Sequence, residues 1–209
     1  MTTKYGFSDV REQLVDSIKN AYPTKWEDFR TARVLGEDVF GSPKPHPNAV
    51  LNLFTEQNIK SALPFAAYQV ALGGFSSLTN DEHGMALPRL ALATIMFGAE
   101  LIRSRFARFA HSAVCNMNLE VCGEDTCLAN VDASLPELRM GALDQIYDAM
   151  IKEGKDDVFS PLSLEGFVCA GCASMLERAY EPWRAKIWEE LPRVFGVGQS
   201  WEEVQPARD

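Results

Sequence analysis

The sequence predicts an all-α protein, a compact bundle of about eight helices with a C-terminal lobe clipped together by zinc. Apolar residues recur at helical spacing almost throughout, and no stretch alternates apolar and polar residues as a half-buried strand does. Two cysteine pairs lie in the C-terminal half. We therefore divide the chain into a helical region over residues 1–114 and a cysteine-containing helical lobe over residues 115–209.

The N-terminal third predicts two helices followed by a loop. Apolar residues between positions 10 and 21 share one helical face, and Pro23 ends this helix because its ring cannot continue the hydrogen-bond ladder. Thr24 and Glu27 form a capping box, which starts a second helix. Three alternating prolines within residues 36–47 then predict a loop.

Two short helices and one long helix are predicted next. Pro47 and Pro64 suit the first turns of the short helices, and Gly73 suits the end of the second. The longest periodic stretch starts near Pro88 and runs past Phe109. Its apolar residues are too numerous for one narrow stripe, so we expect it to be the central, mostly buried element.

The C-terminal half predicts two more helical regions. A capping box of Ser134 and Glu137 begins the first, and Gly154 is expected to end it. The last helical region covers roughly residues 172–190, where Pro182 is expected to kink or divide it.

Charge and hydropathy exclude several classes of partner. The net charge of −9 argues against nucleic acid, which needs a basic footprint. The most apolar run, residues 90–102, is shorter than the roughly 18–20 residues that cross a bilayer. The N-terminus lacks the apolar core of a secretory signal. These features predict an intracellular protein that binds neither nucleic acid nor membrane.

The cysteines form a constellation with a specific spacing. Cys122 and Cys127 make a C-x4-C pair, and Cys169 and Cys172 make a C-x2-C pair. Such spacing lets thiolates converge on one tetrahedral ion, and four thiolates leave zinc no open position for water. We therefore predict a structural zinc site with four cysteine ligands. The 41 residues between the pairs mean that the ion would join two distant segments.

Other interpretations of the cysteines stay open. They could be buried thiols acting as small hydrophobic groups, or Cys169 and Cys172 could form a redox pair. Cys115 continues the apolar long helix, so we expect it in the core, although it could also be a ligand. His111 is the alternative ligand for a site of three cysteines and one histidine.

Classical catalysis finds little support in the sequence. It holds no nucleophile elbow, phosphate-binding glycine loop, H-E-x-x-H motif or dinucleotide fingerprint. His46 is expected to start a helix. Arg103, Arg105 and Arg108 form a basic cluster that is either a solvated helix face or a docking patch for an acidic partner segment. We predict a protein that is not an enzyme, with an enzyme or redox protein as the alternative.

Two groups of short motifs carry a resemblance to a known family. The N-terminal group comprises Lys4-Tyr5-Gly6-Phe7, Asp9-Val10-Arg11, Ala21-Tyr22-Pro23-Thr24, His46-Pro47, Ala49-Val50-Leu51, Ser61-Ala62-Leu63-Pro64-Phe65-Ala66 and Tyr68. The C-terminal group comprises Cys169, Cys172, Arg184, Trp188, Leu191-Pro192, Phe195-Gly196 and Trp201-Glu202-Glu203. Together they resemble the region that follows the POZ core in fungal, especially basidiomycete, BTB/POZ domain proteins.

The resemblance implies a protein-interaction adaptor with helices like those of a BACK region. BTB proteins commonly dimerise through the POZ core, and many recruit a cullin-type ubiquitin ligase while another domain binds the substrate. The POZ core has no counterpart in this sequence, and Gly198-Gln199-Ser200 replaces the Leu-Pro usual before the last tryptophan. The resemblance therefore implies a protein partner. It implies a ubiquitin-ligase scaffold only if that role does not depend on the POZ core.

Overall fold

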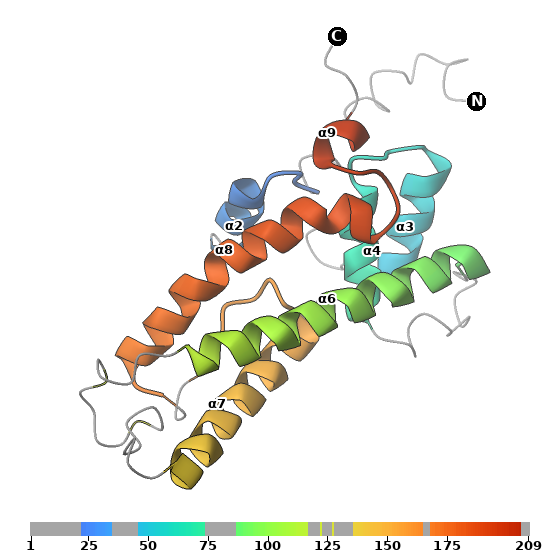
Figure 1. The fold of residues 1–209 in the computed structure, drawn as a ribbon. Coiled ribbons are helices and arrows are strands. Elements are labelled where there is room, and N and C mark those ends of the chain that lie inside the picture. The colour runs from blue at the N-terminus through green and yellow to red at the C-terminus, as the bar shows by residue number, and fades with distance from the viewer. Residues whose placement is uncertain are drawn as a thin grey trace, which may run out of the picture. The chain divides into compact units, whose positions relative to one another are not determined.

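A computed structural model describes residues 22–34, 46–73, 87–116, 122, 127, 136–164 and 168–205 (Figure 1). Within these ranges the chain is helical and holds no strand, which confirms the all-α prediction. The helices are α2 (Trp26–Val34), α3 (Pro47–Glu56), α4 (Leu63–Leu72), α6 (Arg89–Cys115), α7 (Pro136–Asp156), α8 (Ala170–Val194) and α9 (Trp201–Val204). The helix predicted over residues 10–21 lies outside the described residues.

The predicted short helices form where the prolines and caps indicate. His46 is the N-cap of α3, and its Nδ1 accepts a hydrogen bond from the Asn48 amide at 3.3 Å. The helix ends at Glu56 with Gln57 as its C-cap, and the next residue, Asn58, has a φ of 55° in the left-handed region. There the Ile59 amide donates to the Phe54 carbonyl at 2.9 Å, the Schellman pattern that satisfies free carbonyls at a helix end.

The predictions for α7 and α8 were partly wrong. Gly154 does not end α7, which continues to Asp156; instead, a Cβ at this position would overlap the Phe106 ring. Glycine is thus required here for close packing. Pro182 does not divide α8, which is one helix of 25 residues. Buried Leu176 and Ile187 anchor both sides of the proline, which offsets the lost backbone hydrogen bond.

The long helix α6 has 27 residues, but its first turns are not buried as expected. Leu90 is 80% and Phe97 71% exposed, whereas Ile95, Ile102 and Phe106 are buried. The buried residues of this helix lie on one face, and the apolar side chains of Leu90 and Phe97 lie at the surface.

The chain forms two compact units, residues 1–99 with 188–209, and residues 100–187. The unit boundaries lie inside α6 and α8, so each of these helices contributes a part to both units. The sequence-based division into domains at residue 114 stays a prediction. The two spatial units are divided at other positions, because residues 188–209 belong to the same unit as the N-terminal helices.

Trp188 lies at the centre of the first unit's aromatic core and is fully buried. Its ring stacks on those of Phe29 and Trp201, with centroid distances of 4.6 Å and 5.7 Å. The centroid of the Phe65 ring lies 5.2 Å from it. Its indole N–H donates to the Thr24 carbonyl at 3.1 Å. Large aromatic surfaces and a satisfied polar atom therefore hold α2, α4, α8 and α9 together.

The end of α8 is built by residues from the C-terminal motif group. Gly196 has a φ of 64°, a conformation that glycine adopts without steric cost. The Val197 amide donates to the Pro192 carbonyl at 2.8 Å, again a Schellman pattern. Phe195 is buried against Gly98, where a Cβ would lie 2.7 Å from its ring.

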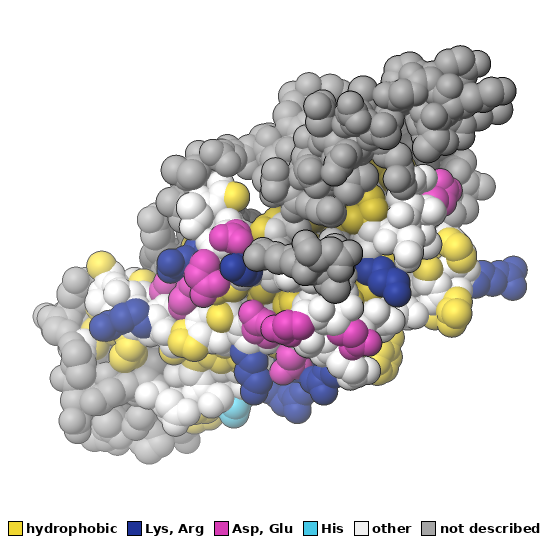
Figure 2. All heavy atoms as spheres, turned by 90° about the horizontal axis from the view of Figure 1, so that it is seen from above, with side chains coloured by type: hydrophobic (Ala, Val, Ile, Leu, Met, Phe, Trp, Pro, Cys, Tyr) yellow, Lys and Arg dark blue, Asp and Glu magenta, His cyan; other side chains and the backbone are white. Residues whose placement is uncertain are grey.

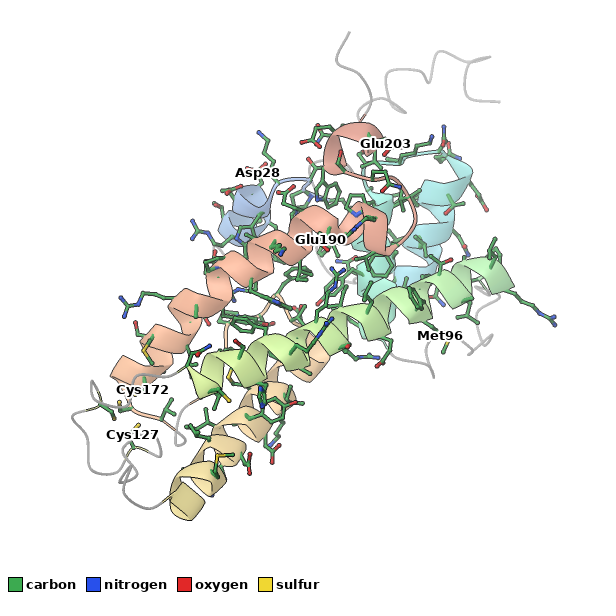
Figure 3. The ribbon with its side chains drawn as sticks, viewed as in Figure 1. Asp28, Met96, Cys127, Cys172, Glu190 and Glu203 are labelled. Atoms are coloured by element: carbon green, nitrogen blue, oxygen red, sulfur yellow. The ribbon has the colours of Figure 1, made fainter. Side chains whose placement is uncertain are left out.

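The second unit contains the C-terminal part of α6, α7 and the N-terminal part of α8. Its core comprises Ala110, Val114, Cys127, Ile146, Ala149, Met150, Leu164, Val168, Cys172 and Leu176. Two of the four predicted metal ligands thus belong to this core, and Figure 3 shows Cys127 close to Cys172 at the start of α8.

The surface of the described residues carries acidic and basic side chains interspersed, as Figure 2 shows for one face. Among the helices that the structure describes, none combines the length and apolar character needed to cross a membrane.

Candidate metal centre

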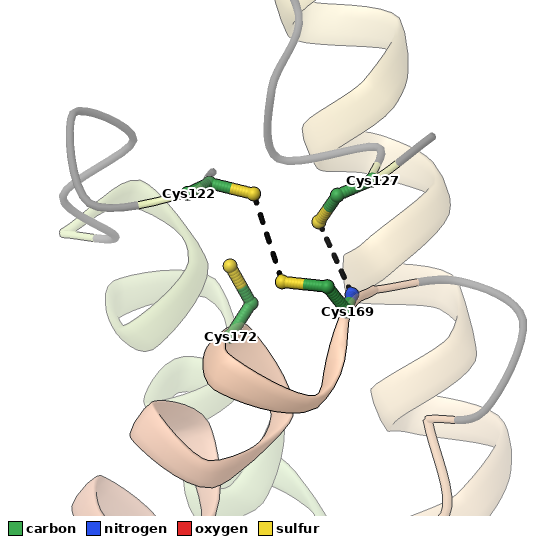
Figure 4. A group of neighbouring side chains, drawn as sticks. All are labelled: Cys122, Cys127, Cys169 and Cys172. Carbon is green, nitrogen blue, oxygen red and sulfur yellow. Dashed lines mark hydrogen bonds between the residues drawn. The ribbon is translucent and has the colours of Figure 1, made fainter. Parts of the chain in front are cut away.

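The sulfur atoms of the two cysteine pairs meet in the second unit. The Sγ atoms of Cys122, Cys127, Cys169 and Cys172 all lie within 4.8 Å of one another and point toward a common centre (Figure 4). The Sγ atoms of Cys122 and Cys169 are 3.6 Å apart. The predicted convergence of the pairs is confirmed, and the four thiols form a group that could hold a metal ion; their role as ligands stays a prediction.

The C-x2-C pair is positioned by the first turn of α8. The Ala173 amide donates to the Cys169 carbonyl at 2.9 Å, so Cys169 occupies the N-cap position. Cys172 follows three residues later, which brings it back over Cys169 on the same side of the turn. The partial positive charge of free amides at a helix N-terminus favours thiolates at this place.

A backbone amide stabilises the second pair. The Cys169 amide donates a hydrogen bond to Cys127 Sγ at 3.2 Å (Figure 4). A backbone amide that points at a ligand sulfur stabilises the thiolate. Its N–H offsets part of the negative charge that four thiolates bring to one site. The bond also joins segments that lie 42 positions apart in the sequence.

The environments of the two C-x2-C thiols differ. The Cys172 backbone amide lowers the pKa of the Cys169 thiol to about 7. Burial raises the pKa of the Cys172 thiol above its ordinary value, and the neighbouring thiols act in the same direction. In the metal-free protein Cys169 thus loses its proton first, while binding a metal would have to displace the proton of Cys172.

The sulfur spacing fits a tetrahedral ion. Thiolates at about 2.3 Å from zinc stand about 3.8 Å apart along the edges of a tetrahedron. The observed 3.6 Å matches this edge, and the largest separation of 4.8 Å exceeds it by about 1 Å. None of the five cysteines forms a disulfide. The donor set of four sulfurs suits soft or borderline ions such as zinc.

Arg184 anchors the connection between α7 and α8 and was missed as a site-supporting residue by the sequence analysis. It is buried, and its Nη1 donates to the Ser160 carbonyl at 3.1 Å. Its Nη2 pairs with Glu177 and, at 2.6 Å, with Glu181, while its guanidinium lies over the Tyr180 ring at 4.6 Å. The spacing of these residues along one face of α8 was the available signal.

Further hydrogen bonds fix the same connection before it reaches the cysteines. The Tyr180 hydroxyl donates to the Val158 carbonyl. The Leu162 amide donates to Glu177 Oε2 at 3.3 Å, and the Phe159 amide donates to Asp157 Oδ1 at 3.0 Å. Together these bonds hold residues 157–164 against the side of α8 whose first turn carries the C-x2-C pair.

Cys115 and His111 lie outside the four-sulfur group. Cys115 is exposed, so the expectation that it belongs to the core was wrong. The buried face of α6 carries Ala110 and Val114, and the next residue is rotated away from it by about 100°. His111 is also exposed; its ring meets Tyr147 edge-on at 6.2 Å and lies 3.9 Å from Cys115 Sγ.

No family model matches the chain, and neither the curated proteins nor the solved structures provide a match.

Proposed function

We propose that the chain is a non-enzymatic protein-interaction module in which Cys122, Cys127, Cys169 and Cys172 bind one structural zinc ion. The convergence of four sulfurs within 4.8 Å carries the zinc part of this proposal. Four thiolates complete the coordination of zinc, so the ion stabilises structure and leaves no position for a reacting water. Zinc would link the segment before α7 to the start of α8.

Two further observations support a closed, structural site. Cys127 and Cys172 are buried in the hydrophobic core of the second unit, where a bound ion is shielded from exchange. The Cys169 amide already points at Cys127 Sγ, which supplies an outer hydrogen bond of the kind that supports metal ligands. Zinc would therefore complete a preformed arrangement of the chain.

Metal analysis tests the zinc site. Protein purified without chelator should hold one zinc per chain, and Cys169→Ser should lose both the metal and cooperative unfolding. Cys115→Ser is the matched control, because Cys115 is exposed and outside the group. Full zinc occupancy in Cys169→Ser would refute the four-thiolate site.

The interaction role rests on the resemblance to the helices that follow the POZ core in BTB/POZ proteins. The C-terminal motif residues have defined packing roles here: Arg184 and Trp188 are buried, and Gly196 shapes the end of α8. A motif group of this kind specifies a helical scaffold, which agrees with an adaptor and does not require an active site. We also propose an intracellular location, where thiols stay reduced.

Comparing zinc-loaded with metal-free protein tests the interaction role. Partners cross-linked in cell extract should be enriched by the zinc-loaded protein and lost with the metal-free protein, since the partner recognises the folded lobe. A purified cullin N-terminal region serves as a defined probe of the ubiquitin-ligase link. Enzymatic turnover by the zinc-loaded protein, with no specific protein partner, would contradict the adaptor proposal.

One observation favours a redox protein as the second candidate function. Cys169 caps α8, its thiol pKa is lowered to about 7, and Cys172 follows in a C-x2-C pair. Thiolates at helix N-termini are the nucleophiles of dithiol exchange. Catalytic thiol–disulfide exchange with a model disulfide substrate by the metal-free protein, together with weak zinc binding, would favour this candidate over the structural site.

A further inference from the structure

We infer that hydrogen peroxide converts the cysteine group into a disulfide between Cys122 and Cys169 and thereby releases the bound metal. This inference concerns regulation of the proposed zinc site and rests on that proposal. It begins from two observations: these two Sγ atoms lie 3.6 Å apart, and both side chains are only partly buried.

Access distinguishes the four thiols. Cys127 and Cys172 are buried at 5% exposure each, within the apolar core. A peroxide molecule in solution therefore meets Cys169 first. Once Cys169 is oxidised, the sulfur of Cys122 is within reach, because forming a disulfide requires the two atoms to close from 3.6 Å to about 2.05 Å.

The chemistry balances with peroxide as the electron acceptor. The partly buried thiolate of Cys169 attacks a peroxide oxygen, the O–O bond breaks, and a sulfenic acid forms with release of hydroxide, which takes a proton to become water. The second thiolate attacks that sulfur, the S–O bond breaks, and a second water leaves once protonated. Two electrons pass from the two sulfurs to the peroxide, and the zinc ion, left with two thiolates, dissociates.

The linkage keeps the two distant segments together after the metal has gone. Cys122 and Cys169 stand 47 positions apart and belong to opposite pairs, so their disulfide replaces the cross-link that zinc provided. A disulfide within the C-x2-C pair would instead leave the two segments unconnected. The structure thus assigns to this site a reversible exchange between a metal cross-link and a covalent one.

Peroxide titration of the full zinc-loaded chain tests the inference. Zinc release is followed with a chromogenic chelator, and the disulfide is mapped by peptide mass spectrometry without reduction. Cleavage after Glu120 and Glu124 separates Cys115, Cys122 and Cys127 into different peptides. Cleavage after Glu165 and Glu177 leaves Cys169 and Cys172 in one peptide, and fragmentation of that peptide distinguishes the two.

We expect one zinc released for each disulfide formed, with Cys122–Cys169 as the predominant linkage. Dithiothreitol and added zinc should restore the reduced, loaded protein. Cys115→Ser should give the same linkage and stoichiometry, because that thiol lies outside the group.

Failure of the inference and failure of the zinc site give different results. A predominant Cys169–Cys172 disulfide, or zinc release accompanied only by sulfinic acid, overturns the inference while the zinc site stands. If the purified protein holds no metal, the zinc proposal fails. The same peroxide mapping on that reduced, metal-free protein still decides whether Cys122 and Cys169 pair.

Discussion

Trp201 Nε1 donates a 2.8 Å hydrogen bond to the backbone carbonyl of Trp188, in the last turns of α8. In an α-helix this carbonyl would accept from the amide four residues later, but that residue is Pro192, which has no N–H. The indole therefore supplies the donor that the proline withholds, and two residues of one motif group depend on each other physically.

We expect Trp201→Phe to lower the free energy of unfolding by about 1–2 kcal/mol, because it leaves a buried carbonyl without this donor. In a Pro192→Ala background the new amide can serve the Trp188 carbonyl, so the same substitution should cost about 1 kcal/mol less. Denaturant unfolding of the four proteins in this double-mutant cycle measures the coupling. Strict additivity would contradict the explanation.

Gly154→Ala should destabilise the protein by about 1–3 kcal/mol, because the added Cβ overlaps the Phe106 ring. Gly141→Ala is the matched control in the same helix α7, since a Cβ there meets nothing within 4 Å. That change should stabilise by up to about 1 kcal/mol through helix propensity. Thermal unfolding compares the two variants, and equal shifts of the same sign would refute the packing role of Gly154.

Arg184→Met should lower the free energy of unfolding by about 2–4 kcal/mol, since it removes the buried guanidinium that pairs with Glu177 and Glu181 and donates to the Ser160 carbonyl. The loss falls below that of a fully buried pair because Glu177 and Glu181 keep 35% and 32% side-chain exposure. Arg193→Met, which breaks an exposed pair with Glu190, should cost less than about 1 kcal/mol. Chemical denaturation measures both, and similar losses would remove the special role of Arg184.

Zinc binding should release fewer protons as the pH rises through about 7. The Cys169 thiol, with its pKa lowered to about 7, is protonated below this pH and must lose its proton on binding, whereas above it the thiolate is already present. Isothermal titration calorimetry in buffers of different ionisation enthalpy counts these protons. We expect a decrease of up to about one proton per ion from pH 6 to pH 8; the absence of a decrease would contradict a Cys169 ligand whose thiol pKa is lowered.

The cross-link itself should be measurable as stability. Closing the loop between Cys127 and Cys169 constrains the unfolded chain by about 4 kcal/mol in the chain-entropy description. Removing zinc from the reduced protein with a chelator should therefore lower the midpoint of unfolding and make the transition less cooperative, and adding zinc back should restore both. Cys115→Ser should respond to chelator as the wild-type chain does, whereas an unchanged midpoint in the wild type would contradict a structural ion.

Local features of the fold were predictable from the sequence. Helical periodicity identified α3, α4 and α6, and His46 starts its helix as expected. The roles of Gly154 and Pro182 were not predictable, because a glycine that permits close packing and one that ends a helix look the same in a sequence. A proline inside a helix is tolerated only when buried neighbours hold both sides, which depends on tertiary contacts.

In the candidate site too, the local features were predictable and the features that depend on tertiary contacts were not. The spacing within each cysteine pair is local and indicated a metal site. Cys115 was misassigned because helical periodicity does not say which face of α6 finds a neighbour. The spacing of Arg184 from Glu177 and Glu181 was visible in the sequence, but its bond to a carbonyl 24 positions away was not.

The sequence by itself determined the helical class, the starts of α3 and α4 and the two cysteine pairs, since these depend on residues within a few positions of one another. Only the tertiary structure decided which thiols meet, which face of α6 is buried and which donor serves the Trp188 carbonyl. The physical reason is that such contacts arise when surfaces distant in the chain pack together, and the identity of those surfaces is a property of the whole fold.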